Sequence, residues 1–256
     1  MLLAVDIGNT ETTIGLFDGT ALKTYWRITT DAHKTADEYS ATIYGLFRLN
    51  GLNPVQLTAA IVSSVVPPLT PAFQDAIATR WGVTPLVIGP GVKTGIPIRY
   101  ENPKEVGADR IVNAVAGIQR YGTPLICIDF GTATTFDVIS NVGEYLGGAI
   151  LPGVTISLDA LFSRAAKLPQ IELSLPKRVI GKTTVESMQS GIVYGIIGQI
   201  NELVKRIQEE LGEESKVVAT GGLASVIGPL CPVVDEVDPL LTLEGLRLIY
   251  ELNTLE

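Results

Sequence analysis

The chain has 256 residues, of which 46% are hydrophobic, and its formal net charge is -8 at pH 7. This length exceeds the common single-domain size of roughly 100 to 200 residues, so we expect one large domain or two similar ones. A negative charge without a basic run excludes typical nucleic-acid partners, which bind clustered Lys and Arg. The longest apolar stretch, residues 146–162, contains Pro152 and Asp159, and no basic flank precedes the first apolar residues. We therefore expect a cytoplasmic protein with no membrane partner.

The first half of the chain predicts three strands followed by alternating helices and strands. The capping box Thr35-Ala-Asp-Glu38 opens the first helix, which closes near Gly51. Apolar periodicity and turn residues delimit the other elements. The predicted strands are 2–7, 12–18, 22–28, 59–63 and 85–88, and the predicted helices are 35–51, 70–81 and 107–121.

The second half repeats this order. Strands are predicted at 124–129, 133–139, 144–149 and 216–219. A long helix begins at the capping box Thr183-Thr-Val-Glu186 and ends at Gly212, and a terminal helix begins at Thr242. We expect an α/β protein with two lobes, residues 1–118 and 119–256, around a central cleft.

A repeated motif supports this duplication. The segments Val5-Asp-Ile-Gly-Asn-Thr-Glu-Thr-Thr13 and Ile128-Asp-Phe-Gly-Thr-Ala-Thr-Thr135 share an aspartate, a glycine and a hydroxyl-rich tail. Glycine lets backbone N–H groups approach an anion, and a carboxylate beside bound phosphates is a natural Mg²⁺ ligand. One copy would be an ordinary β-turn, but two matched copies favour paired phosphate cradles suited to a triphosphate.

Three other segments contain residues that could take part in catalysis or ligand binding. Gly107-Ala-Asp-Arg110 predicts a proton acceptor beside an anion-binding arginine, or alternatively a capped helix with a surface ion pair. Ala219-Thr-Gly-Gly-Leu223 predicts a close backbone approach to adenine or ribose, or helix packing. The segment Pro176-Lys-Arg-Val-Ile-Gly-Lys-Thr183 is similar to the end of a P-loop, but proline replaces its first glycine, so we expect no phosphate site there.

The remaining reactive side chains narrow the chemistry. His33 is the sole histidine and lies in a polar stretch, so any general base must be a carboxylate and a Ser/His/Asp hydrolase is excluded. Cys127 and Cys231 are far apart and form no C-x-x-C pair, so we expect buried, reduced thiols.

Together, these motifs resemble those of type III pantothenate kinases, members of the actin-like, sugar-kinase-like ATPase superfamily, over nearly the whole chain. The resemblance implies a duplicated actin-like ATPase (ribonuclease H-like) fold. It also implies that a homodimer phosphorylates pantothenate to 4′-phosphopantothenate with ATP, the first step of coenzyme A biosynthesis, and requires Mg²⁺ and a monovalent cation (K⁺ or NH₄⁺). Kinase chemistry follows from the residues, whereas pantothenate comes from the resemblance alone. The motifs that carry it are Asp6-Ile-Gly-Asn-Thr10, Gly107-Ala-Asp-Arg110, Asp129-Phe-Gly-Thr-Ala133, Gly147-Gly-Ala-Ile-Leu-Pro-Gly153 and Thr220-Gly-Gly222.

By motif matching, the resemblance also implies the site residues. It makes Asp109 the proton acceptor and Asp129 the monovalent-cation ligand, and the phosphate-cradle argument adds Asp6 as an Mg²⁺ ligand. The implied ATP-binding residues are Asp6, Ile7, Gly8, Asn9, Thr10, Glu11, Thr12, Thr13 and Thr132. The implied pantothenate-binding residues are Tyr100, Gly107, Ala108, Asp109, Arg110 and Thr184, the last of which completes the site at the dimer interface.

Two other functions stay open. A kinase of the same superfamily could act on another hydroxylated or carboxylated metabolite. A non-catalytic regulatory paralogue could bind nucleotide without transferring phosphate, although Asp6, Asp109 and Asp129 are all present. Apolar residues around the helix at 184–211 cover more than one stripe, which predicts either a dimer interface or a helix buried on both faces within one lobe.

Overall fold

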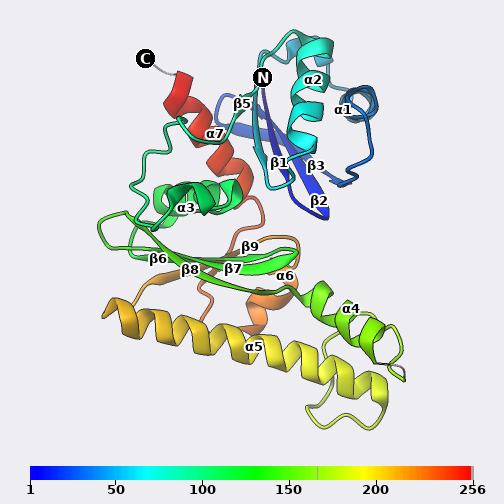
Figure 1. Ribbon diagram of the computed structural model, residues 1–256, viewed down its shortest axis with the longest axis vertical. Coiled ribbons are helices and arrows are strands. Elements are labelled where there is room, and N and C mark those ends of the chain that lie inside the picture. The colour runs from blue at the N-terminus through cyan, green and yellow to red at the C-terminus, as the bar shows by residue number, and fades with distance from the viewer. Residues whose placement is uncertain (166, 255–256) are drawn as a thin grey trace. The chain divides into compact units, whose positions relative to one another are not determined.

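The computed structural model describes residues 1–165 and 167–254 and contains two mixed β-sheets with helices packed on them (Figure 1). The chain divides into two compact units. Unit 1 comprises residues 1–96, residues 100–116 and the C-terminal segment from Leu241, and unit 2 comprises residues 97–99 and 117–240. The lobe boundaries expected from the sequence repeat, residues 1–118 and 119–256, stay a prediction. The compact units differ from them because the C-terminal helix packs with the first sheet.

Unit 1 is built on a five-stranded sheet of order β3-β2-β1-β4-β5. The first three strands form an antiparallel meander, and β4 and β5 continue the sheet in parallel with β1. The order βββαβαβ predicted for this half is confirmed. The elements are β1 (Leu2–Ile7), β2 (Glu11–Asp18), β3 (Ala21–Thr29), α1 (Ala36–Leu49), the 3₁₀ helix η1 (Pro54–Gln56), β4 (Ala59–Ser64), α2 (Leu69–Trp81), β5 (Leu86–Val87), the 3₁₀ helix η2 (Pro103–Glu105), α3 (Ala108–Tyr121) and α7 (Leu241–Thr254).

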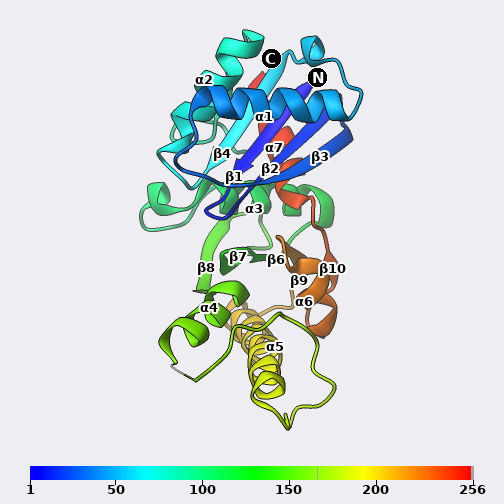
Figure 2. The ribbon, with the colours of Figure 1, turned by 90° about the vertical axis from the view of Figure 1, so that its right-hand side faces the viewer.

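Local sequence explains how the first sheet is covered. The predicted capping box of α1 is present: Thr35 Oγ1 accepts a hydrogen bond from the N–H of Glu38, and Glu38 Oε2 accepts one from the N–H of Thr35 at 2.8 Å. Val5 and Ile7 of β1 belong to the core that α1 and α2 cover. Because side chains alternate along a strand, Asp6 points to the other face, where α7 lies (Figure 2).

The C-terminal helix α7 connects this sheet to α3. It packs against β1, β2 and β4 on one side. On the other side, a Cβ atom at Gly245 would lie 2.1 Å from the carbonyl oxygen of Val112 in α3, so only glycine permits this approach. Thr242 Oγ1 also donates to Asn113 Oδ1 at 2.7 Å. These contacts fix the N-terminal part of α3 within unit 1.

Unit 2 repeats the arrangement with a five-stranded sheet of order β10-β9-β6-β7-β8. Strands β6, β7 and β8 form the antiparallel meander, and β9 and β10 run parallel to β6. Each strand of the first sheet thus has a counterpart in the second, which confirms the predicted duplicated α/β fold. The elements are β6 (Leu125–Phe130), β7 (Ala133–Ile139), β8 (Tyr145–Pro152), α4 (Val154–Arg164), α5 (Thr184–Leu211), β9 (Lys216–Thr220), α6 (Ala224–Ile227), the 3₁₀ helix η3 (Gly228–Leu230) and β10 (Glu236–Val237).

The long helix α5 covers one face of the second sheet (Figure 1). Thr183 Oγ1 caps it by accepting from the N–H of Glu186 at 3.2 Å, whereas Glu186 Oε2 accepts from the N–H of Lys182 at 2.6 Å. The helix ends as predicted at Gly212, whose φ of 74° is left-handed. Its buried residues Ile196, Ile200 and Val204 pack with Ile126, Ile128 and Phe130 of β6.

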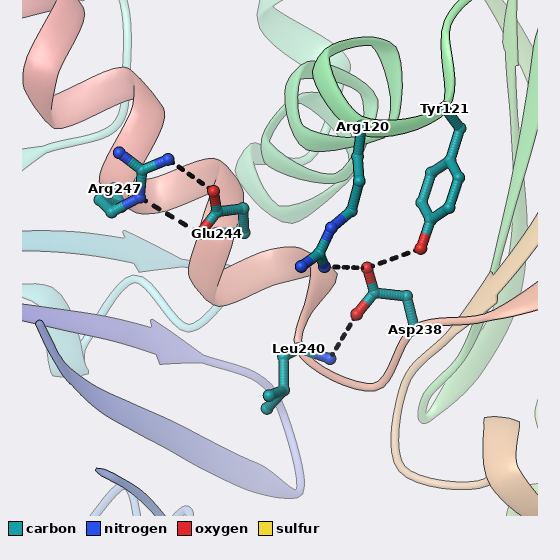
Figure 3. A network of polar contacts seen from close by, with 6 residues as sticks. All are labelled: Arg120, Tyr121, Asp238, Leu240, Glu244 and Arg247. Carbon is teal, nitrogen blue, oxygen red and sulfur yellow. Dashed lines mark hydrogen bonds and ion pairs between the residues drawn. The ribbon is translucent and has the colours of Figure 1, made fainter. Parts of the chain in front are cut away.

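Asp238 joins two segments of unit 2 that are distant in sequence (Figure 3). Its Oδ2 atom forms an ion pair with Arg120 and accepts a hydrogen bond from the Tyr121 hydroxyl at 3.0 Å. Its Oδ1 atom accepts from the N–H of Leu240 at 3.2 Å. Burial and the neighbouring Asp238 carboxylate raise the pKa of Tyr121 to about 12, so the phenol stays a donor. The C-terminal end of α3 is thereby fastened to the segment that leads to α7.

The structure also bears on the predictions about membrane spans, His33 and the two cysteines. None of the helices in residues 1–165 and 167–254 combines the length and apolar character that a membrane span requires. His33 is exposed in a loop, as predicted, and both cysteines are buried free thiols.

Candidate functional site

The first aspartate–glycine loop connects β1 to β2. The N–H of Gly8 donates to the carbonyl oxygen of Glu11 at 3.0 Å, and a Cβ atom at Gly8 would lie only 2.8 Å from that oxygen. Asn9 and Thr10 are exposed at the tip, and Asp6 is half-buried at its base. The loop therefore depends on glycine and presents its tip to solvent, as a phosphate cradle would require.

Thr30 supports this loop, and the sequence analysis missed it. Its hydroxyl donates to the carbonyl oxygen of Gly8 at 2.8 Å, and its N–H donates to that of Thr10 at 3.0 Å. The Thr12 and Thr30 hydroxyls are 2.8 Å apart and share a hydrogen bond. Thr12, predicted to bind ATP, thus has a buried hydroxyl committed to the loop's own support. The available signal was the antiparallel meander, because its register places the end of β3 beside the start of β2.

Glu11 has a different partner from the predicted nucleotide. Its carboxylate pairs with Arg27 of β3, with Nε to Oε1 at 2.6 Å and Nη2 to Oε2 at 2.8 Å. Both side chains are more than a third exposed, so this bidentate pair adds little stability. Within the loop, Glu11 acts through its backbone carbonyl.

The second loop, between β6 and β7, is closed in a similar way with a different support. The N–H of Gly131 donates to the carbonyl oxygen of Ala133 at 3.1 Å, and the N–H of Gly153 donates to that of Thr132 at 3.1 Å. A Cβ atom at Gly153 would lie 2.2 Å from that same Thr132 oxygen. Gly153, at the N-cap of α4, is therefore required for the shape of the loop that contains Thr132.

Asp129 lies in a space that glycine leaves open. Gly221 follows β9 with a φ of +92°, and a Cβ atom there would lie 2.2 Å from Asp129 Oδ1. A Cβ atom at Gly131 would lie 3.4 Å from the same oxygen. The Thr220-Gly-Gly222 motif, for which the sequence suggested nucleotide contact or helix packing, thus has a steric function: it makes room for the Asp129 carboxylate.

This arrangement fits a weakly coordinated cation. Among the residues that the structure describes, no three or more His, Cys, Asp or Glu side chains gather as a metal cage. A cation at Asp6 or Asp129 would therefore have fewer than three such protein ligands, with neutral oxygens and waters completing its shell. Mg²⁺ accepts such a site when substrate phosphates contribute, and monovalent cations are bound by neutral oxygens.

Asp109 lies in the first turn of α3. Its Oδ1 atom accepts a hydrogen bond from the N–H of Arg110 at 2.8 Å, and a Cβ atom at Gly107 would lie 2.5 Å from the same oxygen. Burial raises the pKa of the Asp109 carboxyl above its ordinary value, and the N–H and charge of Arg110 oppose that shift only in part. Arg110 is 7% exposed, so the alternative of a surface ion pair is wrong. A half-buried carboxylate of raised pKa beside a buried cation has the character of a proton acceptor.

The other predicted residues divide between the two units. Tyr100 and residues 107–110 belong to unit 1 together with the loop from Asp6 to Thr13. Asp129, Thr132 and Thr184 belong to unit 2, where Thr184 is the exposed first residue of α5. Their individual roles stay predictions.

The segment similar to a P-loop lacks the structure of one. No strand precedes Gly181 within residues 167–180, and Thr183 caps α5. A Cβ atom at Gly181 would lie 2.5 Å from the backbone nitrogen of Ser187, so this glycine serves packing against the helix.

Comparison with known proteins agrees with this geometry. Residues 2–206 match the family described as type III pantothenate kinase. The type III pantothenate kinase of Moorella thermoacetica is 57% identical over 254 residues, which cover 99% of this chain and 100% of that protein. Among solved structures, the ethanolamine utilization protein EutJ from Carboxydothermus hydrogenoformans has a TM-score of 0.58 at 16% identity and covers 96% of this chain and 89% of its own. The inorganic polyphosphate/ATP-glucomannokinase from Arthrobacter sp. strain KM has a TM-score of 0.51 at 13% identity, with 98% of each chain covered. These structural likenesses support the actin-like, sugar-kinase-like fold.

The steric function of Gly221 is testable by adding one methyl group. Gly221→Ala should displace the Asp129 carboxylate and lower the free energy of unfolding by about 1–3 kcal/mol, as overpacking does. Gly91→Ala is the matched control, because its φ of +97° imposes the same backbone strain on alanine while a Cβ atom there meets nothing within 4 Å. Chemical denaturation of both variants measures the difference. Equal stability of the two variants would contradict a steric function specific to Gly221.

Proposed function

Because this chain belongs to the type III pantothenate kinase family, we propose that its two aspartate–glycine loops bind ATP and that Asp109 activates the pantothenate hydroxyl. The enzyme is a phosphotransferase that converts pantothenate to 4′-phosphopantothenate with ATP, the first step of coenzyme A biosynthesis. One observation carries this conclusion: the family match extends over residues 2–206 and includes both loops and the Asp109 segment.

In the proposed mechanism, Asp109 takes the proton of the 4′-hydroxyl group. The hydroxyl oxygen then forms a bond to the γ-phosphorus, the bond between that phosphorus and the bridging oxygen to the β-phosphate breaks, and ADP leaves with the bonding electrons. Arg110 stabilises negative charge on the substrate or on the transferring phosphoryl group. Positioning and electrostatic stabilisation dominate phosphoryl transfer, so the half-buried position of Asp109 beside a buried arginine supports these roles.

The two loops contribute backbone donors and carboxylates. Exposed backbone at Asn9 and Thr10 is available to phosphate oxygens, while Gly8 and Thr30 hold the loop closed. We assign Asp6 to Mg²⁺ and Asp129 to the monovalent cation, K⁺ or NH₄⁺, since each provides one carboxylate next to a glycine turn. Mg²⁺ would neutralise phosphate charge when bound. Tyr100 and Thr184 are assigned to pantothenate by the family resemblance alone.

The two cysteines support a cytoplasmic location. Both are free and buried. Burial raises the pKa of Cys127 well above its ordinary value and that of Cys231 to about 11. Both thiols therefore stay protonated and unreactive at neutral pH, as suits structural cysteines in a reducing compartment.

A substrate comparison tests the proposed reaction and the two alternatives. A coupled assay of ADP release should respond to pantothenate and show no comparable rate with glucose or acetate. Release with another acceptor only would favour a different metabolite kinase. ATP binding without release with any acceptor would favour the non-catalytic paralogue.

Asp109→Asn tests the proton acceptor. Removing a general base typically costs about 10² to 10⁴-fold, so kcat should fall by at least about 10²-fold. Binding of Mg²⁺·ATP, measured by calorimetry, should persist because the variant leaves the loop at Asp6 unchanged. Turnover near that of the wild type would remove Asp109 from the mechanism.

The raised pKa of Asp109 also predicts how stability and activity change with pH. A raised pKa means that the folded protein favours the protonated carboxyl, so ionisation opposes folding as pH rises through the pKa of Asp109. Asp109→Asn removes that penalty and should be no less stable than the wild type at neutral pH. In the wild type, kcat/KM should decrease as pH falls through this raised pKa, because the base must be ionised.

A homodimer is the proposed active unit, although the structure changes the argument for it. Apolar residues of α5 beside its fully buried stripe pack partly buried against the core of unit 2, namely Ile192, Ile197, Leu203 and Ile207. The exposed residues of α5 between positions 191 and 198 are different, because they are small or aromatic: Gly191, Tyr194, Gly195 and Gly198. A face of glycines and one tyrosine allows the same helix of a second copy to approach closely in an isologous interface.

Gly195→Glu is the variant that tests this interface. A Cβ atom at Gly195 meets nothing within 4 Å, so the substitution should leave the subunit folded while placing two like charges across the interface. Sedimentation should then show monomers, and activity per chain should fall. Gly45→Glu in α1 is the control, since its Cβ position is equally open and lies in unit 1. A wild-type monomer with full activity would overturn the dimer proposal.

A further inference from the structure

Among the residues that the structure describes, three buried hydroxyl groups have no hydrogen-bond partner, and two of them belong to fully buried residues. Ser63 in β4 and Thr220 in β9 are both 0% exposed, and neither Ser63 Oγ nor Thr220 Oγ1 is bonded. Buried hydroxyls are normally paired, because losing water without gaining a partner is unfavourable. Each of these two groups therefore needs an explanation.

Both hydroxyls occupy the same place in the duplicated fold. The parallel register of β1 with β4 pairs Asp6 with Ser63, and that of β6 with β9 pairs Asp129 with Thr220. Directly paired residues of parallel strands point to the same face of the sheet. Each hydroxyl thus lies beside the aspartate of its unit, at the carboxyl ends of two adjacent strands, on the face away from the main helical layer.

Packing alone does not account for these residues. Valine fills the space of threonine and alanine nearly that of serine, and neither leaves a polar atom buried and unpaired. The flanking residues follow that rule, since Val62 and Ala219 are apolar and belong to the two cores. A hydroxyl retained at both equivalent positions indicates a function that the chain acquires when a ligand binds.

The chemistry of the neighbouring aspartate indicates the kind of ligand. A cation that leaves water for a site with one carboxylate needs neutral oxygens to replace part of its hydration shell, and a serine or threonine hydroxyl can supply one. At Asp129, the missing side chain of Gly221 makes room for the carboxylate that would bind the cation. At Asp6, the metal-bound waters that Mg²⁺ retains could donate to the Ser63 hydroxyl.

We propose that Ser63 and Thr220 are two further ligand-binding residues of the kinase: Ser63 acts with Asp6 when Mg²⁺·ATP binds, and Thr220 acts with Asp129 when the monovalent cation binds. This inference rests on the proposed function for the identity of the ligands. It adds a neutral oxygen from the adjacent parallel strand to each carboxylate.

Thermal unfolding with and without ligands tests the inference. Without ligand, Thr220→Val and Ser63→Ala should unfold at the wild-type temperature or above it, because no hydrogen bond is lost. With Mg²⁺ and a non-hydrolysable ATP analogue, the stabilisation should shrink in Ser63→Ala. In Thr220→Val, the additional stabilisation by KCl over NaCl should disappear, and half-maximal activity should require about 10 to 100-fold more K⁺, as when a metal site loses a supporting group.

Conservative and remote variants control for indirect effects. Thr220→Ser and Ser63→Thr retain the hydroxyl and should restore the ligand responses. Ser215→Ala removes another buried, unpaired hydroxyl, which precedes β9 at its opposite end, and should change neither response. If Thr220→Val does not fold, Thr220→Ala supports the same comparison with Thr220→Ser.

The outcomes separate this inference from the proposed reaction. Wild-type ligand responses in Thr220→Val and Ser63→Ala would overturn the inference, as would a lower unfolding temperature without ligand and an unchanged response to it. A wild-type protein that is stabilised by the analogue but does not phosphorylate pantothenate would overturn the reaction and leave the two hydroxyls as ligand groups.

Discussion

The parallel pairing of β1 with β4 and of β6 with β9 is the constraint on which the rest of the structure depends. The pairing ends at Asp129 in the second sheet and one residue after Asp6 in the first, and it brings a hydroxyl residue from a distant part of the chain beside each aspartate. On the other side of β1 and β6, the antiparallel partners β2 and β7 begin directly after the glycine turns. Each loop therefore lies at the same end of its sheet as the paired aspartate and hydroxyl. A carboxylate and a hydroxyl thus come together beside a glycine turn in each sheet.

Close contacts that only glycine allows determine the conformation of the loops at these strand ends. Gly8 and Gly153 meet carbonyl oxygens of the loops, and Gly221 meets the Asp129 carboxylate itself. The contacts at Gly8 and Gly153 shape the loops, and the contact at Gly221 restricts the Asp129 carboxylate. Such restriction suits a kinase, because positioning supplies most of its catalysis. Asp109 is governed by electrostatics instead: burial raises the pKa of its carboxyl group, and the neighbouring Arg110 opposes part of that shift. Unit 1 thus combines the loop that we propose binds phosphate with a carboxyl group suited to accept a proton.

The sequence predicted the elements and the loops because their signals are local. Strand alternation, the cap at Thr35 and the left-handed Gly212 all depend on neighbouring residues, and the repeat itself exposed Asp6 and Asp129. Thr30 was missed because the register of the predicted meander was not used. Ser63 and the steric function of Gly221 could not be predicted, since each depends on strand register between segments far apart in the chain. The position of α7 in unit 1 was missed for the same reason, because Gly245 meets Val112 across more than half the sequence. Pantothenate could be predicted only through family resemblance, because spacing and composition do not distinguish one small alcohol from another.

The central claim is that the carboxyl ends of the parallel strand pairs β1–β4 and β6–β9 are ligand sites, each built from an aspartate and the hydroxyl paired with it. A crystal structure with Mg²⁺, a non-hydrolysable ATP analogue and thallium(I) in place of K⁺ would test this claim most directly, because thallium is located by its anomalous scattering. We expect an anomalous peak within coordination distance of both Asp129 and Thr220 Oγ1, and the triphosphate at residues 8–13 with its metal waters bonded to Ser63. A thallium peak remote from Asp129, or one whose oxygen shell excludes Thr220 while Ser63 remains unbonded, would contradict the claim.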